Sequence, residues 1–251
     1  MRVLALDTTT SSGSVAIVDD SGVLVEAIGD PARSHAERLP GDILQAVDHV
    51  GIGIAEIDVF AVAAGPGTFT GLRIGIAMIQ GLALVSGKRI VPVSALRALA
   101  AAASREEPSG RIIGAWMDAH RRDVFSALFR RTDRSPFESE GLIELEGAAV
   151  GNPAATLARW VDSGMTPDIL VGDGAIAYAS AIPPQISTLE QLPLAGVIGQ
   201  IAIARAAGGD TVAPAGVQPL YIRRPDAEIA RDAAQSQRTA DARDSKPKVQ
   251  S

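Results

Sequence analysis

Two short polar segments contain residue types that hold phosphate groups in proteins. One is Asp7–Ser12 (DTTTSS) and the other is Gly172–Gly174 (GDG), and each follows an apolar, β-rich segment. Hydroxyls and backbone N–H groups in such turns can contact phosphate oxygens, although this chain has Thr9 where a glycine would allow closer approach. A polar turn closed by its own side chains is the alternative for both segments. The candidate contacts for nucleotide phosphate are Asp7, Thr8, Thr9, Gly172, Asp173 and Gly174.

A glycine-rich segment, Gly65–Arg73 (GPGTFTGLR), links a β-rich segment to the start of a helix. The first N–H groups of a helix have no partner within it and the helix dipole is positive there, so an anion could bind at this end. The glycines could equally serve the turn and allow close packing of the helix on a sheet. The spacing alone leaves both interpretations open.

The helix predicted over Leu72–Val85 is apolar on nearly all sides. Such a helix is normally buried on all sides, yet a sheet covers one face only. Gly71, Gly75 and Gly81 would each cost about 1 kcal/mol relative to alanine, which predicts that another backbone comes close. The second covering surface is either the neighbouring helix over 34–50 or a partner protein.

We expect these two helices to form a protein–protein interface. The helix over 34–50 also has apolar residues on more than one face, which a single sheet cannot cover. The candidate interface residues are Leu39, Ile43, Leu44, Val47, Leu72, Arg73, Ile76, Ile79, Gln80 and Ala83.

Nucleophilic and metal chemistry has few candidate residues in this chain. It has no cysteine, which excludes thiolate nucleophiles and cysteine-based zinc or iron–sulfur sites. The three histidines, His35, His49 and His120, lack the spacing that places two metal ligands on one helical face. We therefore predict no metal site, and we expect His35 to be an exposed polar residue. The spacing leaves a Ser/His/Asp triad open, although the chain has no G-x-S-x-G motif.

A charged turn, Asp118–Asp123 (DAHRRD), joins two β-rich segments. One interpretation is a hairpin turn whose charges face solvent, and the other is a loop at a cleft whose arginines contact RNA or nucleotide phosphate. The chain has 23 basic and 29 acidic residues, for a net charge of −6. Because that sign does not favour a polyanion, any RNA contact must be local or come from a partner.

The predicted elements follow the order βββαβαβα twice. The first set comprises strands at 2–7, 14–18 and 23–28, a helix at 34–50, a strand at 57–64, a helix at 68–86, a strand at 89–93 and a helix at 94–103. The second comprises strands at 111–118, 123–130 and 142–146, a helix at 152–161, a strand at 169–172, a helix at 175–181, a strand at 185–188 and a helix at 194–207. Two such RNase H-like units match the α/β actin-like ATPase (ASKHA) fold, which places nucleotide in the cleft between its halves.

We expect an N-terminal subdomain over 1–105, completed by the helix at 194–208, and a second subdomain over 106–193. A linker and extended segment follow over 209–224. Residues 225–251 are rich in charge and poor in apolar side chains, which predicts a disordered tail. With no signal-peptide pattern and no run of about 18 apolar residues, we expect a soluble cytoplasmic protein.

Six motifs together resemble the bacterial TsaB (YeaZ) family, from residue 1 to about residue 224. They are ALDTTT, SHAERLP, AVAAGPGTFTGLRIG, VSALRALA, WMDAHRRDVFSA and PLYIRR. The longest of them, which contains GPGTFTGLRIG, is fairly specific. The resemblance implies an actin-like fold and a pairing surface on helices of the N-terminal half, where the burial pattern also predicts an interface.

The resemblance also implies a function. TsaB is the non-catalytic subunit of the machinery that makes N6-threonylcarbamoyladenosine (t6A) at position 37 of tRNAs that read ANN codons. It forms a heterodimer with the catalytic paralogue TsaD, which carries a metal-binding histidine pair, and it works with the small ATPase TsaE.

Several expectations about partners follow. The chain would be a scaffold subunit with no cofactor of its own, would contact ATP or ADP weakly or at the complex interface, and would meet tRNA through the complex. A homodimer of the isolated chain stays open, and no membrane partner is expected. The alternative function is an independent actin-like ATPase or phosphotransferase that uses the interdomain cleft.

Overall fold

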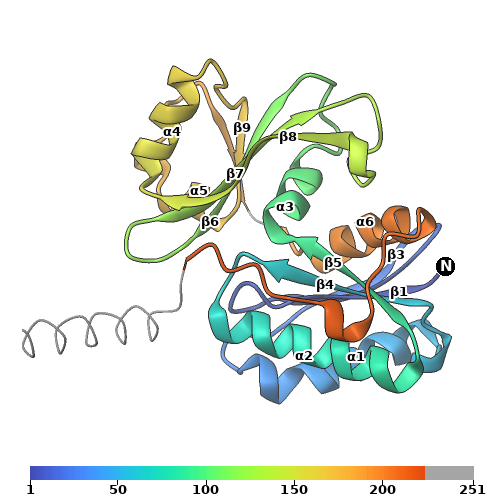
Figure 1. Cartoon of the computed structure of the whole chain (residues 1–251). Helices are drawn as coiled ribbons and strands as arrows, with labels where there is room; N and C mark the ends of the chain where they lie inside the picture. Colours follow the sequence, from blue (N-terminus) through green and yellow to red (C-terminus); the bar gives the residue numbers. More distant parts are fainter. Residues whose placement is uncertain (191, 224–251) are drawn as a thin grey trace, which may run out of the picture. The chain divides into compact units, whose positions relative to one another are not determined.

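Two five-stranded sheets of the same topology organise the chain (Figure 1). The computed structural model describes residues 1–190 and 192–223. The first sheet has the order β3-β2-β1-β4-β5, with β2 antiparallel to β1 and β3, and with β4 parallel to β1 and β5. Its strands are β1 (Val3–Asp7), β2 (Ser14–Asp19), β3 (Gly22–Ile28), β4 (Val59–Gly65) and β5 (Arg89–Ser94).

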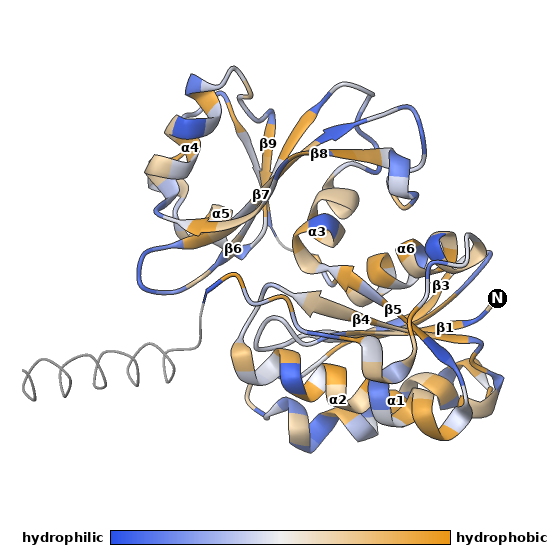
Figure 2. Ribbon diagram, viewed as in Figure 1, coloured by the Kyte–Doolittle hydropathy of each residue, from blue (hydrophilic) through white to orange (hydrophobic). Residues whose placement is uncertain are grey.

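Two helices, α1 (His35–Val50) and α2 (Phe69–Ser86), cover one face of this sheet (Figure 1). Successive side chains of a strand point to opposite faces, so Leu4 and Leu6 of the buried strand β1 share a face. Both belong to the cluster that includes Ile17 and apolar residues of α1 and α2. Figure 2 shows the matching hydrophobic colour along these strands and helices.

The opposite face of the first sheet is covered by α6 (Ala195–Ala207), a helix from the far end of the described chain. Gly199 comes so close to β2 that a Cβ there would lie 2.4 Å from Val18 Cγ2. The N–H of Gly196 donates to the Glu26 carboxylate at 2.8 Å, which ties the start of α6 to β3. The last α-helix of the described residues therefore packs on the first sheet.

The second sheet repeats this topology with the order β10-β9-β6-β7-β8. Trp116 and Trp160 form the centre of its core, with ring centroids 6.1 Å apart. The elements are β6 (Ile112–Asp118), β7 (Val124–Arg131), β8 (Leu142–Gly151), α4 (Pro153–Asp162), β9 (Ile169–Val171), α5 (Asp173–Ala177) and β10 (Ser187–Leu189). The repeated order confirms the α/β fold class expected from the sequence.

Most predicted elements are present within a few residues of their expected ends. The eighth element of the first set is α3 (Ala95–Ala103), which begins after Ser94, whose hydroxyl accepts the N–H of Arg97 at 3.3 Å. The largest differences are β8, which is longer than expected, and the helix expected at 175–181, which is α5 followed by the 3-10 helix η3 (Ala179–Ala181). The described part of the chain also has the 3-10 helices η1 (Ile54–Glu56), η2 (Ser139–Gly141) and η4 (Pro214–Gly216).

The segment after α6 returns to the first sheet. Val212 pairs with Ile90 of β5, and the N–H of Leu220 donates to the carbonyl of Ala64 at 2.7 Å. Residues Met1–Leu220 form one compact unit, and the division into subdomains stays a prediction. The tail predicted over 225–251 lies outside the described residues.

Within the described residues, α2 is the one helix that is long and apolar enough, by length and composition, to cross a membrane. Core helices of soluble proteins pass the same test, and the buried side of α2 belongs to the core of the first sheet. Its apolar character is therefore accounted for in part by packing within the chain.

Candidate functional site

The two predicted phosphate segments meet at a cavity of about 270 Å³. Asp7 reaches it from the end of β1, and Asp173 reaches it from the start of α5, beyond the end of β9. The crevice outside the carboxyl ends of strands is where α/β sheets commonly bind ligands. The lining residues are Asp7, Thr10, Ser11, Ser12, Gly13, Ser14, Ile28, Asp173, Leu192 and Pro193.

Both aspartates of the cavity have perturbed pKa values. Burial raises the pKa of Asp7, which hydrogen bonds from Thr9 oppose and the charge of Asp173 reinforces. Burial also raises the pKa of Asp173, whose Oδ1 accepts the N–H of Asp118 at 2.9 Å. Two carboxylates repel a phosphate group, so this donor set suits a cation or a hydroxyl-bearing ligand better than a bare phosphate.

Thr8 and Thr9, two of the candidate phosphate contacts, are buried and do not line the cavity. The N–H and the hydroxyl of Thr9 both donate to Asp7 Oδ1, at 2.9 and 2.7 Å. A Cβ at Gly67 would lie 2.6 Å from Thr9 Cβ, and one at Gly71 would lie 2.1 Å from the carbonyl oxygen of Thr8. The glycine-rich segment thus packs its helix against the β1–β2 turn, which supports the packing interpretation.

Gly172 and Gly174 also have a packing role. Gly172 has a φ of 116°, and a Cβ there would lie 2.2 Å from the carbonyl oxygen of Trp116. A Cβ at Gly174 would lie 2.9 Å from the carbonyl carbon of Met117. These glycines bring α5 onto β6, and of the six predicted phosphate contacts Asp7 and Asp173 line the cavity.

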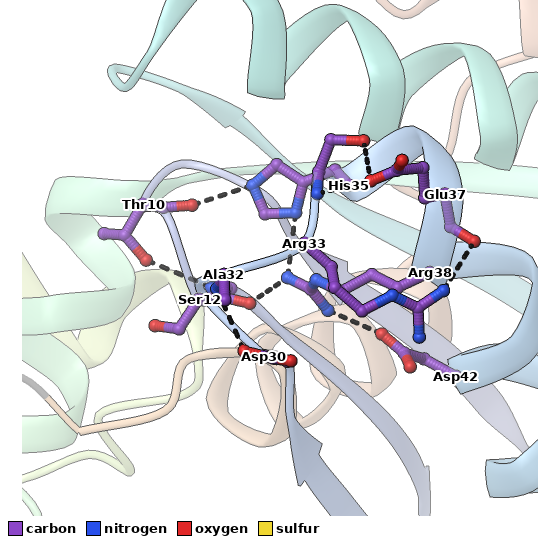
Figure 3. A network of polar contacts seen from close by, with 11 residues as sticks. Thr10, Ser12, Asp30, Ala32, Arg33, His35, Glu37, Arg38 and Asp42 are labelled. Atoms are coloured by element: carbon purple, nitrogen blue, oxygen red, sulfur yellow. Dashed lines mark hydrogen bonds and ion pairs between the residues drawn. The ribbon is translucent and has the colours of Figure 1, made fainter.

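A buried polar network supports the cavity loop from α1 (Figure 3). His35 Nε2 lies 2.8 Å from the carbonyl oxygen of Thr10, and its Nδ1 lies 2.9 Å from the Arg38 guanidinium. Because an arginine only donates, Nδ1 is the acceptor and Nε2 carries the proton. Arg38 also donates to the carbonyl of Ser12 and pairs with Asp42 at 2.5 Å. Thr10 and Ser12 line the cavity, so α1 and the cavity loop are joined.

The expectation that His35 is exposed is wrong, since 8% of its surface is accessible. Burial is the main cause that lowers the pKa of this imidazole, and the Thr10 carbonyl opposes it. Arg38 is buried as well, at 3% exposed, because Gly29 leaves room for it: a Cβ at Gly29 would overlap the guanidinium. The sequence signal was available in the spacing of His35 and Arg38, which lie about one helical turn apart and on one side of α1.

The predicted partner interface needs correction at the level of residues. Seven of its ten residues are at most 5% exposed and therefore unavailable to a partner, namely Leu39, Ile43, Val47, Leu72, Ile76, Ile79 and Ala83. Their periodicity reflects the side of each helix that faces the sheet. Gln80 is engaged within the chain, since its Nε2 donates to the carbonyls of Pro214 and Val217 at 2.8 and 3.3 Å. The covering surface on that side of α2 is the chain's own segment around η4.

A different side of α2 is exposed and largely apolar. Leu84 and Val85 are 72% and 91% exposed, and the Arg73 guanidinium lies 3.9 Å from the ring centroid of Phe69. Exposed residues of α2 follow Phe69 at intervals of three or four positions up to Leu84 and Val85, so they form one stripe along the helix. We call this stripe the α2 face: Phe69, Arg73, Ala77, Gly81, Leu84 and Val85, all exposed. Leu44 of α1 is also exposed, at 54%.

The charged turn between β6 and β7 has an unusual backbone. His120, Arg121 and Arg122 have φ values of 56°, 55° and 67°, and all three are exposed. The left-handed region costs a non-glycine residue roughly 1–2 kcal/mol, and such residues occur there mostly singly. We call these three residues the basic loop. They do not line the cavity.

No group of three or more His, Cys, Asp or Glu residues that could hold a metal ion occurs in residues 1–190 and 192–223. The expectation that the chain binds no metal stays a prediction.

Comparisons with known proteins place these features in context. Residues 29–164 match the family model described as "TsaD: tRNA N6-adenosine threonylcarbamoyltransferase". The chain is 30% identical over 240 residues to "tRNA threonylcarbamoyladenosine biosynthesis protein TsaB" of Escherichia coli, covering 89% of this chain and 95% of that protein. It is 28% identical to the protein of the same name from Haemophilus influenzae, covering 89% and 94%. The solved structure of YeaZ from Pseudomonas aeruginosa is 27% identical, with a TM-score of 0.72, and covers 88% of this chain and 99% of that one.

Proposed function

The chain belongs to the TsaB family, and on that premise we propose that it is a non-catalytic subunit of the machinery that makes threonylcarbamoyladenosine in tRNA. It forms a heterodimer with a catalytic paralogue of the TsaD type and works with a TsaE-like ATPase. The complex acts in the cytoplasm on adenosine 37 of tRNAs that read ANN codons. Contact with tRNA is completed through the complex, and ATP or ADP binds weakly or at its interface.

The α2 face is the observation that carries this proposal. It exposes Phe69, which is 39% exposed, at the start of α2 and Leu84 and Val85 at its end, on a helix whose other sides are covered within the chain. Scattered exposed apolar residues need no explanation, but a rimmed apolar stripe favours a protein partner. Arg73, which packs on Phe69, would supply a charged contact at the edge of that interface.

The cavity supports the proposal that this chain catalyses no reaction itself. Thr9 fills the place where a phosphate would need close backbone approach, and its N–H and hydroxyl are used on Asp7. The carboxylates of buried Asp7 and half-buried Asp173 disfavour a bare phosphate. An ATPase that used this cavity alone would need a cation to bridge nucleotide and aspartates.

The experiment is co-purification of the full chain with its catalytic paralogue. Val85→Glu and Leu84→Glu place a charge on the α2 face without touching the core, and we expect each to weaken the heterodimer at least tenfold. Ile76 and Ile79 are unsuited, because at 5% and 0% exposed a charge there would unfold the chain. Circular dichroism of the purified variants confirms that they stay folded.

Val161→Glu is the matched control, because Val161 is an exposed valine, at 45%, near the end of helix α4. It adds the same charge to a helix of the second sheet and should leave the affinity for the paralogue unchanged. Unchanged affinity in both α2 variants would contradict the proposed interface. Failure of the wild-type chain to bind any TsaD-type protein would contradict the proposed function itself.

A further inference from the structure

Arg38 of α1 holds the cavity loop, which we define as residues 10–13 between β1 and β2 (Figure 3). Its guanidinium donates to the carbonyl of Ser12 in that loop and pairs at 2.5 Å with Asp42, one turn further along α1. It fills the space left by Gly29, which follows β3 and where a Cβ would overlap the guanidinium. At 3% exposed, this cation is screened little by solvent, so the charges beside it matter.

His35 completes this arrangement in its neutral form. Its Nδ1 lies 2.9 Å from the Arg38 guanidinium, and its Nε2 lies 2.8 Å from the carbonyl oxygen of Thr10. Because an arginine has no acceptor, Nδ1 accepts the bond and Nε2 carries the ring proton. A second proton can therefore enter at Nδ1 alone. It would place an N–H and a positive charge against the guanidinium.

The charged groups that face His35, within the described residues, lie on α1 and β1. They are Arg38 and Asp42 on α1 and Asp7 on β1. Burial is the main cause that lowers the pKa of the imidazole, and the charge of Arg38 adds to it. The Thr10 carbonyl and the two carboxylates oppose this shift. The folded chain thus favours the neutral ring, which takes up its second proton below the ordinary histidine value of 6.5.

We propose that His35 and Arg38 form a pH-sensitive latch, which holds the cavity loop against α1 at neutral pH and releases it in acid. When Nδ1 gains a proton, the ring and the guanidinium are two cations in contact, and they repel each other. Arg38 then moves toward Asp42, which has the opposite charge, and leaves the carbonyl of Ser12. Because Ser12 lines the cavity, its release opens that wall.

The remaining bonds of the cavity loop are long. The N–H of Gly13 donates to the hydroxyl of Thr10 at 3.2 Å, and the carbonyl of Gly13 accepts the N–H of Gly29 at 3.3 Å. Typical N–H···O distances are about 2.9–3.0 Å, so both bonds are weak. The position of the loop therefore depends on α1. The amides of Gly13 and Gly29 report its state.

Nuclear magnetic resonance of the full chain tests the latch, because three histidines give imidazole signals that can be followed one by one. Between pH 7.5 and pH 5 we expect the ring of His35 and the amides of Ser12 and Gly13 to shift with one common midpoint, below 6.5. Hydrogen exchange at Gly13 and Gly29, corrected for its intrinsic pH dependence, should become about tenfold faster, as in a local opening. The amides of β7 should keep their exchange rate.

His35→Gln is the main variant, because glutamine offers an acceptor to Arg38 and a donor to Thr10 but does not titrate. Its cavity loop should exchange at one corrected rate at both pH values. His49→Gln, at an exposed position of the same helix, should behave as wild type. Asp7→Asn removes the buried carboxylate beside the loop, and its loop should still open in acid.

Four results would overturn the latch. They are acid opening that persists in His35→Gln, loop exchange in wild type that does not change with pH, acid opening that is lost in Asp7→Asn, and an equal acceleration of the β7 amides, which would mean global unfolding. If His35→Gln does not fold, the wild-type titration decides, since different midpoints for the His35 ring and the loop amides would contradict the coupling. The test needs no partner, so its outcome is independent of the proposed function.

Discussion

The hydroxyl of Thr9 donates a 2.7 Å hydrogen bond to Oδ1 of Asp7. Asp7 is 2% exposed and lines the cavity. The hydrogen bonds from Thr9 stabilise its carboxylate from within the chain. Thr9 in turn packs its Cβ toward Gly67 at the entry to α2. The turn that could have received a phosphate is instead part of the packing that holds α2 on the sheet.

Asp7→Asn should stabilise the protein at neutral pH. Asparagine keeps an oxygen acceptor for the N–H and hydroxyl of Thr9 and removes the buried charge. We expect Tm to rise by about 2–4 °C, which corresponds to about 1 kcal/mol in a domain of this size. Differential scanning calorimetry at pH 7 measures it.

The pH dependence of that difference has a definite sign. Burial raises the pKa of Asp7 in the folded state, so the folded protein binds a proton more readily than the unfolded chain does. Stability attributable to Asp7 therefore increases as pH falls through the folded pKa toward the ordinary aspartate value. The advantage of Asp7→Asn should shrink from pH 7 to pH 4, and an advantage that is constant with pH would contradict the assignment.

Arg38→Ala should lower the free energy of unfolding by about 3 kcal/mol. It removes a buried cation from the carbonyl of Ser12, from His35 and from Asp42, which leaves buried polar groups without partners. Arg38→Lys should recover little of the loss, because one ammonium group cannot reproduce the planar fork. Urea titrations measure both variants, and full recovery with lysine would show that charge alone matters there.

His35 should make the protein less stable in acid. Burial lowers its pKa in the folded state, so its contribution is complete above the unfolded histidine value near 6.5 and is lost as pH falls below it. His35→Gln removes the titrating group and keeps a polar side chain. The difference in Tm between wild type and His35→Gln should therefore depend on pH between 7 and 5, whereas His49→Gln, at an exposed position of α1, serves as the control.

Glycines of α2 should respond to alanine in opposite ways. Gly71→Ala would place a Cβ 2.1 Å from the carbonyl oxygen of Thr8 and should cost about 2 kcal/mol or more, as overpacking does. Gly81 has open space around it, so Gly81→Ala should stabilise the helix by up to about 1 kcal/mol. Thermal melts of the two variants give the comparison, and destabilisation by Gly81→Ala would contradict it.

Calorimetry of the isolated chain with Mg-ATP tests the alternative function, an independent ATPase or phosphotransferase. The scaffold proposal expects no turnover by the chain alone. Micromolar binding with turnover that Asp7→Ala abolishes would favour the alternative function and would assign the cavity as its site.

Much of the architecture could be predicted because its signals are local. The alternation in β1, the turn before β3 and the apolar period of α1 depend on neighbours in the sequence, and these elements lie where expected. The repeated order of the two sheets follows from the same signals. The glycines of α2 predicted the close approach of another segment. At Gly71 and Gly75 that segment is the turn at Thr8, whereas no atom lies within 4 Å of a Cβ placed at Gly81.

The candidate surfaces could not be predicted in the same way. Apolar spacing shows that Ile76 and Leu84 lie on a helix, but it does not say which of them faces the sheet, because that depends on how α2 sits against strands distant in sequence. The burial of His35 likewise depends on the loop at Thr10, 25 residues earlier in the chain.

The sequence by itself therefore determined the order of the elements, the fold class and the resemblance to a family, since each rests on local pattern. The tertiary structure alone decided which apolar residues are core, that Asp7 and Asp173 share a cavity, and that Arg121 and Arg122 occupy a strained turn. The first two features arise when segments far apart in the chain come into contact, which no local pattern records. The third depends on backbone torsion angles that the residue types of the turn do not indicate.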